Sequence, residues 1–286
     1  MNAVEIRNLK KSMGDFKLEI DSLEIKEGFV TGIVGTNGAG KTTLMRLIMN
    51  ILNQDYGTIK IFGEDFDKNK KHIKELIGYL GHETLYPVDF TLEDIKSSIS
   101  IFYKNWDERL FNKYIEDFNL NLNDTYKDLS KGQKVKFDLA MILSYHPKLI
   151  ILDEPTANLD PLFRREFLEI LQLQMEKDLS TVIYCTHITS DLDKIGDYFI
   201  AMDKGEIIFN EDNENIRNNY VIVKGMKELL NNDTKGVFLY IKENEFGFRG
   251  ISNNKIEAQD IFGQEVIYER PNMEDMLMLN KGRKND

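Results

Sequence analysis

The chain has 286 residues, of which 42% are hydrophobic and 30% are charged, and its net charge is −11. That length predicts about two domains, while so acidic a chain disfavours general binding to nucleic acid or anionic lipid, since both attract basic proteins. Apolar runs too short to cross a bilayer, a polar N-terminus without a signal peptide and a single cysteine, Cys185, predict a cytoplasmic protein without an internal disulfide.

The first third of the sequence predicts strands that lead into a glycine-rich loop. Strands are expected at residues 3–9, 16–25 and 29–34, and the last one runs directly into the loop. Residues 57–62 predict a further strand. Between the loop and that strand we expect a helix, whose apolar face consists of Leu44, Leu47, Ile48 and Ile51.

The segment 88–145 predicts a mainly helical block. A capping box at Thr91 starts one helix, residues 106–118 predict a second, and a capping box at Ser130 starts a third. Each box places an acidic or amide side chain three residues after the cap. The cap side chain and this side chain each accept the other residue's backbone N–H, so two N–H groups at the start of each helix are satisfied locally.

Two short apolar runs beyond this block predict buried parallel strands. They lie at residues 148–152 and 180–185 and are rich in β-branched side chains. Between them, Asp160 supplies a helix cap and Pro161 the first helical residue. The alternation of strands and helices predicts an α/β domain over residues 1–210.

The character of the sequence changes after about residue 210. The asparagine-rich residues 211–219 predict a loop-like linker, and residues 220–286 predict a small α+β domain. Strands are expected there at residues 220–223, 237–241, 246–251 and 265–268, and short helices at residues 226–231, 257–262 and 273–280. That βαββαβα order is compatible with a ferredoxin-like module. The domain shows no acid–base pair, metal-ligand spacing or glycine loop.

The glycine-rich loop carries the clearest chemical signal. Residues 35–42, Gly-Thr-Asn-Gly-Ala-Gly-Lys-Thr, match the phosphate-binding pattern G-x-x-x-x-G-K-[ST] between a predicted strand and a predicted helix. In such a loop the backbone N–H groups point at phosphate oxygens, Lys41 contacts the β- and γ-phosphates, and the Thr42 hydroxyl completes a Mg²⁺ site. The predicted nucleotide-binding residues are Gly35, Asn37, Gly38, Ala39, Gly40, Lys41, Thr42 and Thr43.

Polar residues follow both buried strands. Asp153 and Glu154 end the first strand, and His187 stands just beyond the second. The carboxyl ends of parallel strands form the edge at which α/β sheets bind ligands. Asp153 is suited to holding Mg²⁺ through water, and Glu154 to polarising an attacking water as a general base. Alone, an acidic turn or a single histidine would carry little weight, but downstream of a phosphate loop both become candidate site residues.

The start of the third helix offers a second group of anion-binding atoms. Ser130, Gly132 and Gln133 combine a hydroxyl, an unobstructed glycine N–H and a helix N-terminus within one turn. An ordinary capped helix fits this pattern. So does a second phosphate-binding segment, presented across a dimer interface to the nucleotide of a neighbouring subunit.

Five motifs in order resemble the ATP-binding subunit of ABC transporters: GTNGAGKTT, LSKGQ, LIILDE, ANLD and the isolated His187, over roughly residues 1–210. The resemblance implies a P-loop NTPase fold with a mainly parallel core sheet, an antiparallel β subdomain and a helical subdomain. It implies an ATPase that uses ATP and Mg²⁺ in a head-to-tail dimer. Each ATP would touch Lys41 and Thr42 of one subunit and Ser130 and Gly132 of the other.

The same resemblance assigns individual roles. Glu154 would be the catalytic base, His187 would contact the γ-phosphate, and Asp160 would link the two sites across the dimer. A narrower resemblance rests on Trp106-Asp107 before the signature and on Phe246-Gly-Phe in the small domain. These features are similar to ATPases of two-component Gram-positive exporters, including peptide, bacitracin and phenol-soluble modulin exporters.

Two positions depart from the family pattern. His82, followed by Glu83, stands where the family offers a glutamine to Mg²⁺ and the membrane partner, and a protonated imidazole would repel the metal. We therefore expect turnover to fall at mildly acidic pH. Met13 stands where the family has an aromatic ring that stacks on adenine. Base recognition would then be loose, or Phe16 would take over the stacking.

The resemblance implies a separate transmembrane permease, contacted through a groove between Glu83 and the helical block. It places the chain at the inner face of the cell membrane, as a homodimer or paired with a second ATPase. Binding to nucleic acid and direct insertion into the membrane are not expected. The alternative is a soluble ABC ATPase in translation or in DNA and chromosome maintenance. Translation factors of this type usually carry two nucleotide-binding halves in one chain, and this sequence shows one. ABC ATPases of chromosome maintenance contain a long coiled coil, and this sequence shows no sustained heptad repeat. A protein that binds ATP without hydrolysing it is disfavoured by Glu154 and His187.

Overall fold

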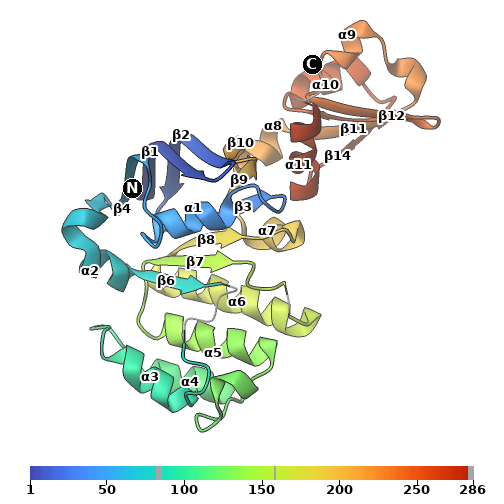
Figure 1. The fold of residues 1–286 in the computed structure, drawn as a ribbon. Helices are drawn as coiled ribbons and strands as arrows, with labels where there is room; N and C mark the ends of the chain where they lie inside the picture. Colours follow the sequence, from blue (N-terminus) through green and yellow to red (C-terminus); the bar gives the residue numbers. More distant parts are fainter. Residues whose placement is uncertain (82–85, 158, 283–286) are drawn as a thin grey trace. The chain divides into compact units, whose positions relative to one another are not determined.

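The computed structural model describes residues 1–81, 86–157 and 159–282, which form two compact units (Figure 1). The first unit comprises Met1–Ile188 with Met202–Glu206, and the second comprises Thr189–Ala201 with Ile207–Asp286. The strands β9 (Tyr198–Asp203) and β10 (Glu206–Asp212) contribute residues to both units. No helix in the described ranges is long and apolar enough to cross a membrane.

An antiparallel sheet belongs to the first unit and confirms the predicted β subdomain. Its strand order is β2-β1-β4-β5. The strands are β1 (Asn2–Met13), β2 (Phe16–Lys26), β4 (Tyr56–Ile61) and β5 (Glu64–Asp65). β1 is longer than predicted because its polar end continues to Met13, which pairs with Phe16 across a tight turn at Gly14. Gly14 has φ +59°, a left-handed conformation that glycine adopts at low cost.

Four parallel strands in the order β3-β8-β7-β6 form the centre of the first unit, and they belong to a six-stranded sheet that β9 and β10 continue beyond β3. Its strands are β3 (Val30–Gly35), β6 (Ile77–Leu80), β7 (Leu149–Asp153) and β8 (Thr181–Cys185). Every residue of β7 and β8 is buried, as expected for parallel strands covered on both faces. The associated helices are α1 (Lys41–Ile48), α2 (Phe66–Leu76) and α6 (Pro161–Asp178). The predicted parallel core sheet is thus confirmed.

The helical block of the first unit gathers beside β6 in Figure 1. It contains α3 (Leu92–Ser100), α4 (Glu108–Asp117), the 3₁₀ turn η1 (Tyr126–Asp128) and α5 (Lys131–Leu143). The predicted capping boxes at Thr91 and Ser130 are both present. α4 begins later than predicted because the Asp107 carboxylate accepts the backbone N–H groups of Arg109 and Leu110 and so caps the helix.

The second unit contains a four-stranded antiparallel sheet with the order β12-β13-β11-β14. Its strands are β11 (Val221–Gly225), β12 (Tyr240–Asn244), β13 (Gly247–Ser252) and β14 (Ile267–Glu269). Its helical segments are α7 (Thr189–Ile195), α8 (Asn213–Asn219), η2 (Lys227–Leu229), α9 (Asn232–Lys235), α10 (Lys255–Phe262) and α11 (Met273–Gly282). Because the first strand of the module lies between the third and the fourth, the predicted ferredoxin-like arrangement is confirmed.

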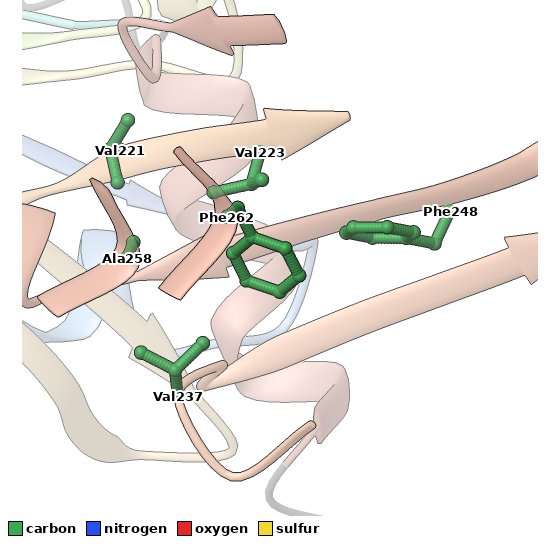
Figure 2. Close-up of a cluster of buried hydrophobic side chains, with 6 residues drawn as sticks. All are labelled: Val221, Val223, Val237, Phe248, Ala258 and Phe262. Carbon is green, nitrogen blue, oxygen red and sulfur yellow. The ribbon is translucent and has the colours of Figure 1, made fainter. Parts of the chain in front are cut away.

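An apolar cluster holds this sheet to α10 (Figure 2). It is formed by Val221, Val223, Val237, Phe248, Ala258 and Phe262. Val221 and Val223 point to one face of β11, and Ile222 and Ile251, which belong to the opposite face, are buried as well. The second unit therefore has a core of its own.

The prediction of a loop at residues 213–219 was wrong, because this segment forms α8. The Asp212 carboxylate accepts the backbone N–H of Asn215 at 2.6 Å and so caps the helix. Ile216, the single apolar residue of the segment, is buried. A cap and one buried side chain thus outweigh the low helix propensity of asparagine.

Candidate functional site

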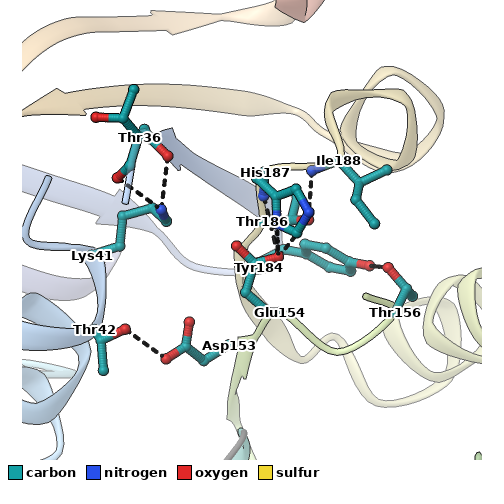
Figure 3. Close-up of polar contacts among 11 residues, drawn as sticks. Thr36, Lys41, Thr42, Asp153, Glu154, Thr156, Tyr184, Thr186, His187 and Ile188 are labelled. Atoms are coloured by element: carbon teal, nitrogen blue, oxygen red, sulfur yellow. Dashed lines mark hydrogen bonds and ion pairs between the residues drawn. The ribbon is translucent and has the colours of Figure 1, made fainter. Parts of the chain in front are cut away.

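The glycine loop joins β3 to α1 and surrounds the amine of Lys41 (Figure 3). Lys41 is buried, and its Nζ donates hydrogen bonds to the carbonyl oxygens of Gly35 at 2.8 Å and Thr36 at 3.4 Å. Gly40 precedes the helix with φ +104°, and a Cβ there would lie 3.0 Å from the Phe16 ring. The loop therefore requires glycine at this position and holds a cation at the N-terminus of a helix, an arrangement suited to phosphate.

Thr42 and Asp153 join α1 to the end of β7. The Thr42 hydroxyl, on the first turn of α1, donates to Oδ2 of Asp153 at the end of β7, at 3.0 Å. A hydroxyl and a carboxylate are the oxygen ligands that Mg²⁺ prefers, and Mg²⁺ usually completes its shell with water and substrate phosphates. The two side chains thus fit a Mg²⁺ site that the nucleotide itself would complete.

Glu154 and His187 pair at the same edge of the sheet. Nδ1 of His187 lies 2.8 Å from Oε2 of Glu154, and the backbone N–H of His187 donates to the same oxygen at 3.2 Å. The side chain of Glu154 is 11% exposed and that of His187 is 59% exposed. The carboxylate is thus enclosed, while the imidazole stands at the surface where a ligand could reach it.

Thr186, which precedes His187 in the sequence motif but for which the sequence predicted no role of its own, completes this group. The Thr186 hydroxyl donates to Oε2 of Glu154 at 3.2 Å, and Figure 3 shows it directed at the carboxylate beside His187. Farther along the sheet edge, the hydroxyls of Thr156 and Tyr184 lie 3.2 Å apart. Neither contact follows from a local motif, since each joins residues about 30 positions apart in the chain.

The phosphate loop, Asp153 and Glu154 line one hollow of about 470 Å³, called here the loop hollow, whereas Thr186 and His187 are not among its described lining residues. Its walls are Met13, Phe16, residues 36–43, Asp153 and Glu154. Met13 and Phe16 both border it, so the two side chains considered for contact with the base lie on the same wall. Gly35 contributes through its carbonyl contact with Lys41 rather than by lining the hollow.

The signature segment lies elsewhere in the first unit. Ser130 Oγ accepts the backbone N–H of Gln133 at 3.2 Å, and Gln133 Oε1 accepts that of Ser130 at 2.9 Å, while Gly132 is open to solvent on its Cβ side. Among the described residues that line the loop hollow, none comes from this segment. The chain therefore does not bring Ser130, Gly132 and Gln133 to its own phosphate loop.

Asp160 caps α6, as the sequence predicted. Its Oδ1 accepts the backbone N–H groups of Phe163 and Leu162, each at 3.0 Å. The hydrogen bond from Phe163 is the largest cause of the lowered pKa of Asp160. His82 and Glu83, the departures expected at the glutamine position, lie outside the described residues.

A second hollow, called here the tyrosine groove, lies between the helical block and the sheet. It has a volume of about 460 Å³. Its aromatic walls are Tyr79, Tyr86, Phe102, Tyr103 and Tyr145. Tyr103 and Tyr145 stack with ring centroids 3.8 Å apart, and the Tyr145 hydroxyl donates to the Ile77 carbonyl at 3.1 Å. The sequence predicted a groove at this block but not the residues that line it.

The glycine loop, with an acidic pair at the end of β7 in the same sheet, defines a P-loop nucleoside triphosphatase. The family model of ABC transporters matches residues 18–157. YdbJ of Bacillus subtilis (strain 168), an uncharacterized ABC transporter ATP-binding protein, is 32% identical over 208 residues, covering 71% of this chain and 67% of that protein. This chain belongs to the ATP-binding subunits of ABC transporters, a family of ATPases.

Further comparisons support the same family. The bacitracin transport ATP-binding protein BcrA of Bacillus licheniformis is 30% identical over 213 residues, covering 72% of this chain and 68% of that protein. The probable sulfate/thiosulfate import ATP-binding protein CysA of Chlorella vulgaris is 31% identical, covering 72% and 89%. A solved ATP-binding subunit of an ABC transporter shares the fold, with a TM-score of 0.69 at 24% identity, over 75% of this chain and 92% of that chain. The resemblance drawn from the five motifs is confirmed.

Proposed function

We propose that this chain is the ATP-hydrolysing subunit of a membrane exporter and works with a separate transmembrane permease. The observation that carries the proposal is the loop hollow, where Lys41, the Thr42–Asp153 pair and Glu154 share one cavity. A buried ammonium, an oxygen-only metal site and an enclosed carboxylate are the three groups that phosphoryl transfer to water requires. They stand together at the edge of a parallel sheet where ligands bind.

Each of these residues has a distinct part in the proposed chemistry. Lys41 and the loop N–H groups bind the β- and γ-phosphates, and Thr42 and Asp153 hold Mg²⁺, which neutralises charge on the phosphates. Glu154 accepts a proton from the water that attacks the γ-phosphorus, while the bond to the β,γ-bridging oxygen breaks. Its enclosure favours this role, because a carboxylate with little access to bulk water keeps its orientation towards one bound water.

The proposed assembly is a head-to-tail dimer with two ATP molecules at the interface. The loop hollow is open, and its described lining includes no residue of the signature segment. Ser130, Gly132 and Gln133 stand at the N-terminus of α5, where the helix dipole favours an anion. A second subunit would supply these groups to the γ-phosphate, and Asp160 would lie where the two sites communicate.

The tyrosine groove is the proposed docking site for the permease. It joins two features expected of such a site. Its walls are mainly aromatic and aliphatic, with the charged residues Lys71, Lys74 and Glu75 also lining it, and Phe102 is a large aromatic side chain that is 68% exposed. The partner would hold the chain peripherally at the inner face of the membrane, and a second ATPase subunit, identical or different, would complete the assembly. Export is favoured by the likeness to BcrA and by the Trp106-Asp107 and Phe246-Gly-Phe features, although relatives also include an import protein.

Glu154→Gln tests the catalytic part of the proposal. We expect it to bind ATP and to form the ATP-dependent dimer but to lose about 99% or more of the turnover, in line with removal of a general base. Glu169→Gln, an exposed carboxylate on α6, serves as the matched control and should hydrolyse ATP at the parental rate. Near-parental turnover by Glu154→Gln would overturn the assignment of the base.

A further inference from the structure

We propose that Thr186 is a positioning residue for ATP hydrolysis, which holds the Glu154 carboxylate in its working orientation throughout the nucleotide cycle. The inference rests on the proposed function, in which Glu154 is the base. Thr186 is not among the described residues that line the loop hollow, so it acts through Glu154 rather than on the nucleotide.

The sheet register places the two residues side by side. Asp153 of β7 is paired with Cys185 of β8, so the next residue on each parallel strand, Glu154 and Thr186, leaves the sheet at the same level. The Glu154 N–H donates to the Cys185 carbonyl at 2.8 Å. Glu154 also has φ +53°, which is uncommon for a residue with a side chain and turns it back towards β8.

The Thr186 backbone is fixed from the other side. Its N–H donates to the carbonyl of Ile33 on β3 at 3.2 Å, which ties the residue to the strand that feeds the phosphate loop. The base and the phosphate loop are thus connected through one residue. A threonine is suited to such a place because its branched Cβ restricts rotation about χ1.

The hydroxyl of Thr186 has only one way to donate. Its oxygen accepts the Ile188 N–H at 2.9 Å, and its single hydrogen is directed to Oε2 of Glu154 at 3.2 Å. The side chain is fully buried, so bulk water does not compete for either contact. A hydrogen bond to a charged acceptor in such a place is stronger than one at the surface.

His187 and Thr186 both contact Oε2 of Glu154, but only the His187 side chain is exposed enough to rotate away. The imidazole of His187 is 59% exposed and can rotate towards a γ-phosphate, which breaks its contact with Glu154. The Thr186 hydroxyl keeps Oε2 in place when that happens. Because these contacts fall on Oε2, Oε1 is the oxygen presented to a water molecule.

The test compares Thr186→Val, which removes the hydroxyl at nearly equal volume, with Thr186→Ser, which keeps it. We expect Thr186→Val to lower kcat about tenfold or more with an unchanged KM for ATP, and Thr186→Ser to stay within about threefold of the parent. Thr31→Val is the matched control, because Thr31 is also a buried sheet threonine and its hydroxyl has no hydrogen-bond partner in the described structure. It should leave kcat unchanged.

Glu154→Gln, measured alongside, separates this inference from the proposed function. If Glu154→Gln loses turnover while Thr186→Val hydrolyses ATP like the parent, Thr186 has no positioning role. If Glu154→Gln itself is active, the assignment of the base is wrong instead. Should Thr186→Val fold poorly, Thr186→Ser still decides, because a tenfold loss of kcat with the hydroxyl retained would contradict the proposal.

Discussion

The hydroxyl of Tyr126 lies 3.1 and 3.2 Å from the two carboxylate oxygens of Asp138. Tyr126 begins the 3₁₀ turn that leads into the signature segment, and Asp138 lies two turns into α5. The Tyr86 ring packs edge-on against Tyr126 at 5.3 Å, and the Lys134 ammonium lies 5.2 Å from the Tyr126 ring centroid. Burial is the main cause that raises the pKa of Asp138 to about 7.

This shift makes the stability of the helical block depend on pH. Because the folded pKa lies above the reference value of 3.8, the carboxyl stabilises the fold below about pH 4, and that contribution is lost as pH rises towards 7. Asp138→Asn removes the charge and keeps an acceptor for Tyr126. We expect it to raise the free energy of unfolding by about 3 kcal/mol at pH 8, with a clearly smaller gain at pH 5.

Denaturant titration followed by the fluorescence of Trp106, which lies in the same block, measures this effect. Asp117→Asn on α4 is the control and should show no such change with pH. A gain for Asp138→Asn that is equal at pH 5 and pH 8 would contradict the account of the raised pKa of Asp138.

Replacement of His187 separates binding from chemistry. His187→Ala should lower kcat by about 100-fold, because it removes a donor from the reacting phosphate while leaving the loop and Lys41 intact. The affinity for ATP, measured by titration with a fluorescent analogue, should change by less than about threefold. A similar loss of ATP affinity and of turnover would mean that His187 contributes to binding ATP rather than to stabilising the transition state.

Thr31→Val should stabilise the first unit. The Thr31 hydroxyl is buried on β3 and lacks a hydrogen-bond partner in the described structure, so the folded state leaves a polar group unsatisfied. Valine has nearly the same shape and removes that cost. We expect the free energy of unfolding to rise by about 1 kcal/mol, as measured by thermal and denaturant unfolding. A destabilisation of this size would show that the hydroxyl has a partner in solution.

Met13 provides a test of base recognition. Met13 and Phe16 are the apolar walls of the loop hollow, so the base should be held by packing, with turnover of ATP and GTP within about threefold of each other. Met13→Tyr should lower the KM of both nucleotides by about three- to tenfold, through stacking on the base. Strong preference of the parent for ATP would show that hydrogen bonds read the base edge.

The elements that carry the candidate site residues were predictable because they rest on local patterns. β7 and β8 are uninterrupted apolar runs, and α5 begins at a capping box formed within four residues. The phosphate loop follows its strand directly. Each signal lies within one short segment, so no knowledge of the tertiary structure was needed.

The contacts that organise these elements were not predictable, because they join distant positions. Thr186 meets Glu154 from 32 residues away, and its role depends on the register of two parallel strands. The environment of Asp138 was not predictable for the same reason. An aspartate on a helix suggests an exposed side chain, and only the tertiary structure shows the aromatic residues around it. The ferredoxin-like order, by contrast, follows from the succession of strands and helices.

The central claim is that this ATPase works on a membrane partner through the tyrosine groove. Crosslinking in the native cell, followed by mass spectrometry of the co-purified proteins, tests it most directly, with the parent, Phe102→Glu and Ile101→Glu compared. Phe102 lines the groove, whereas Ile101 is a neighbouring apolar residue, 75% exposed, that does not. We expect a polytopic membrane protein with the parent and with Ile101→Glu, and its loss with Phe102→Glu. Recovery only of ribosomes, nucleic-acid complexes or other soluble proteins would contradict the transporter account.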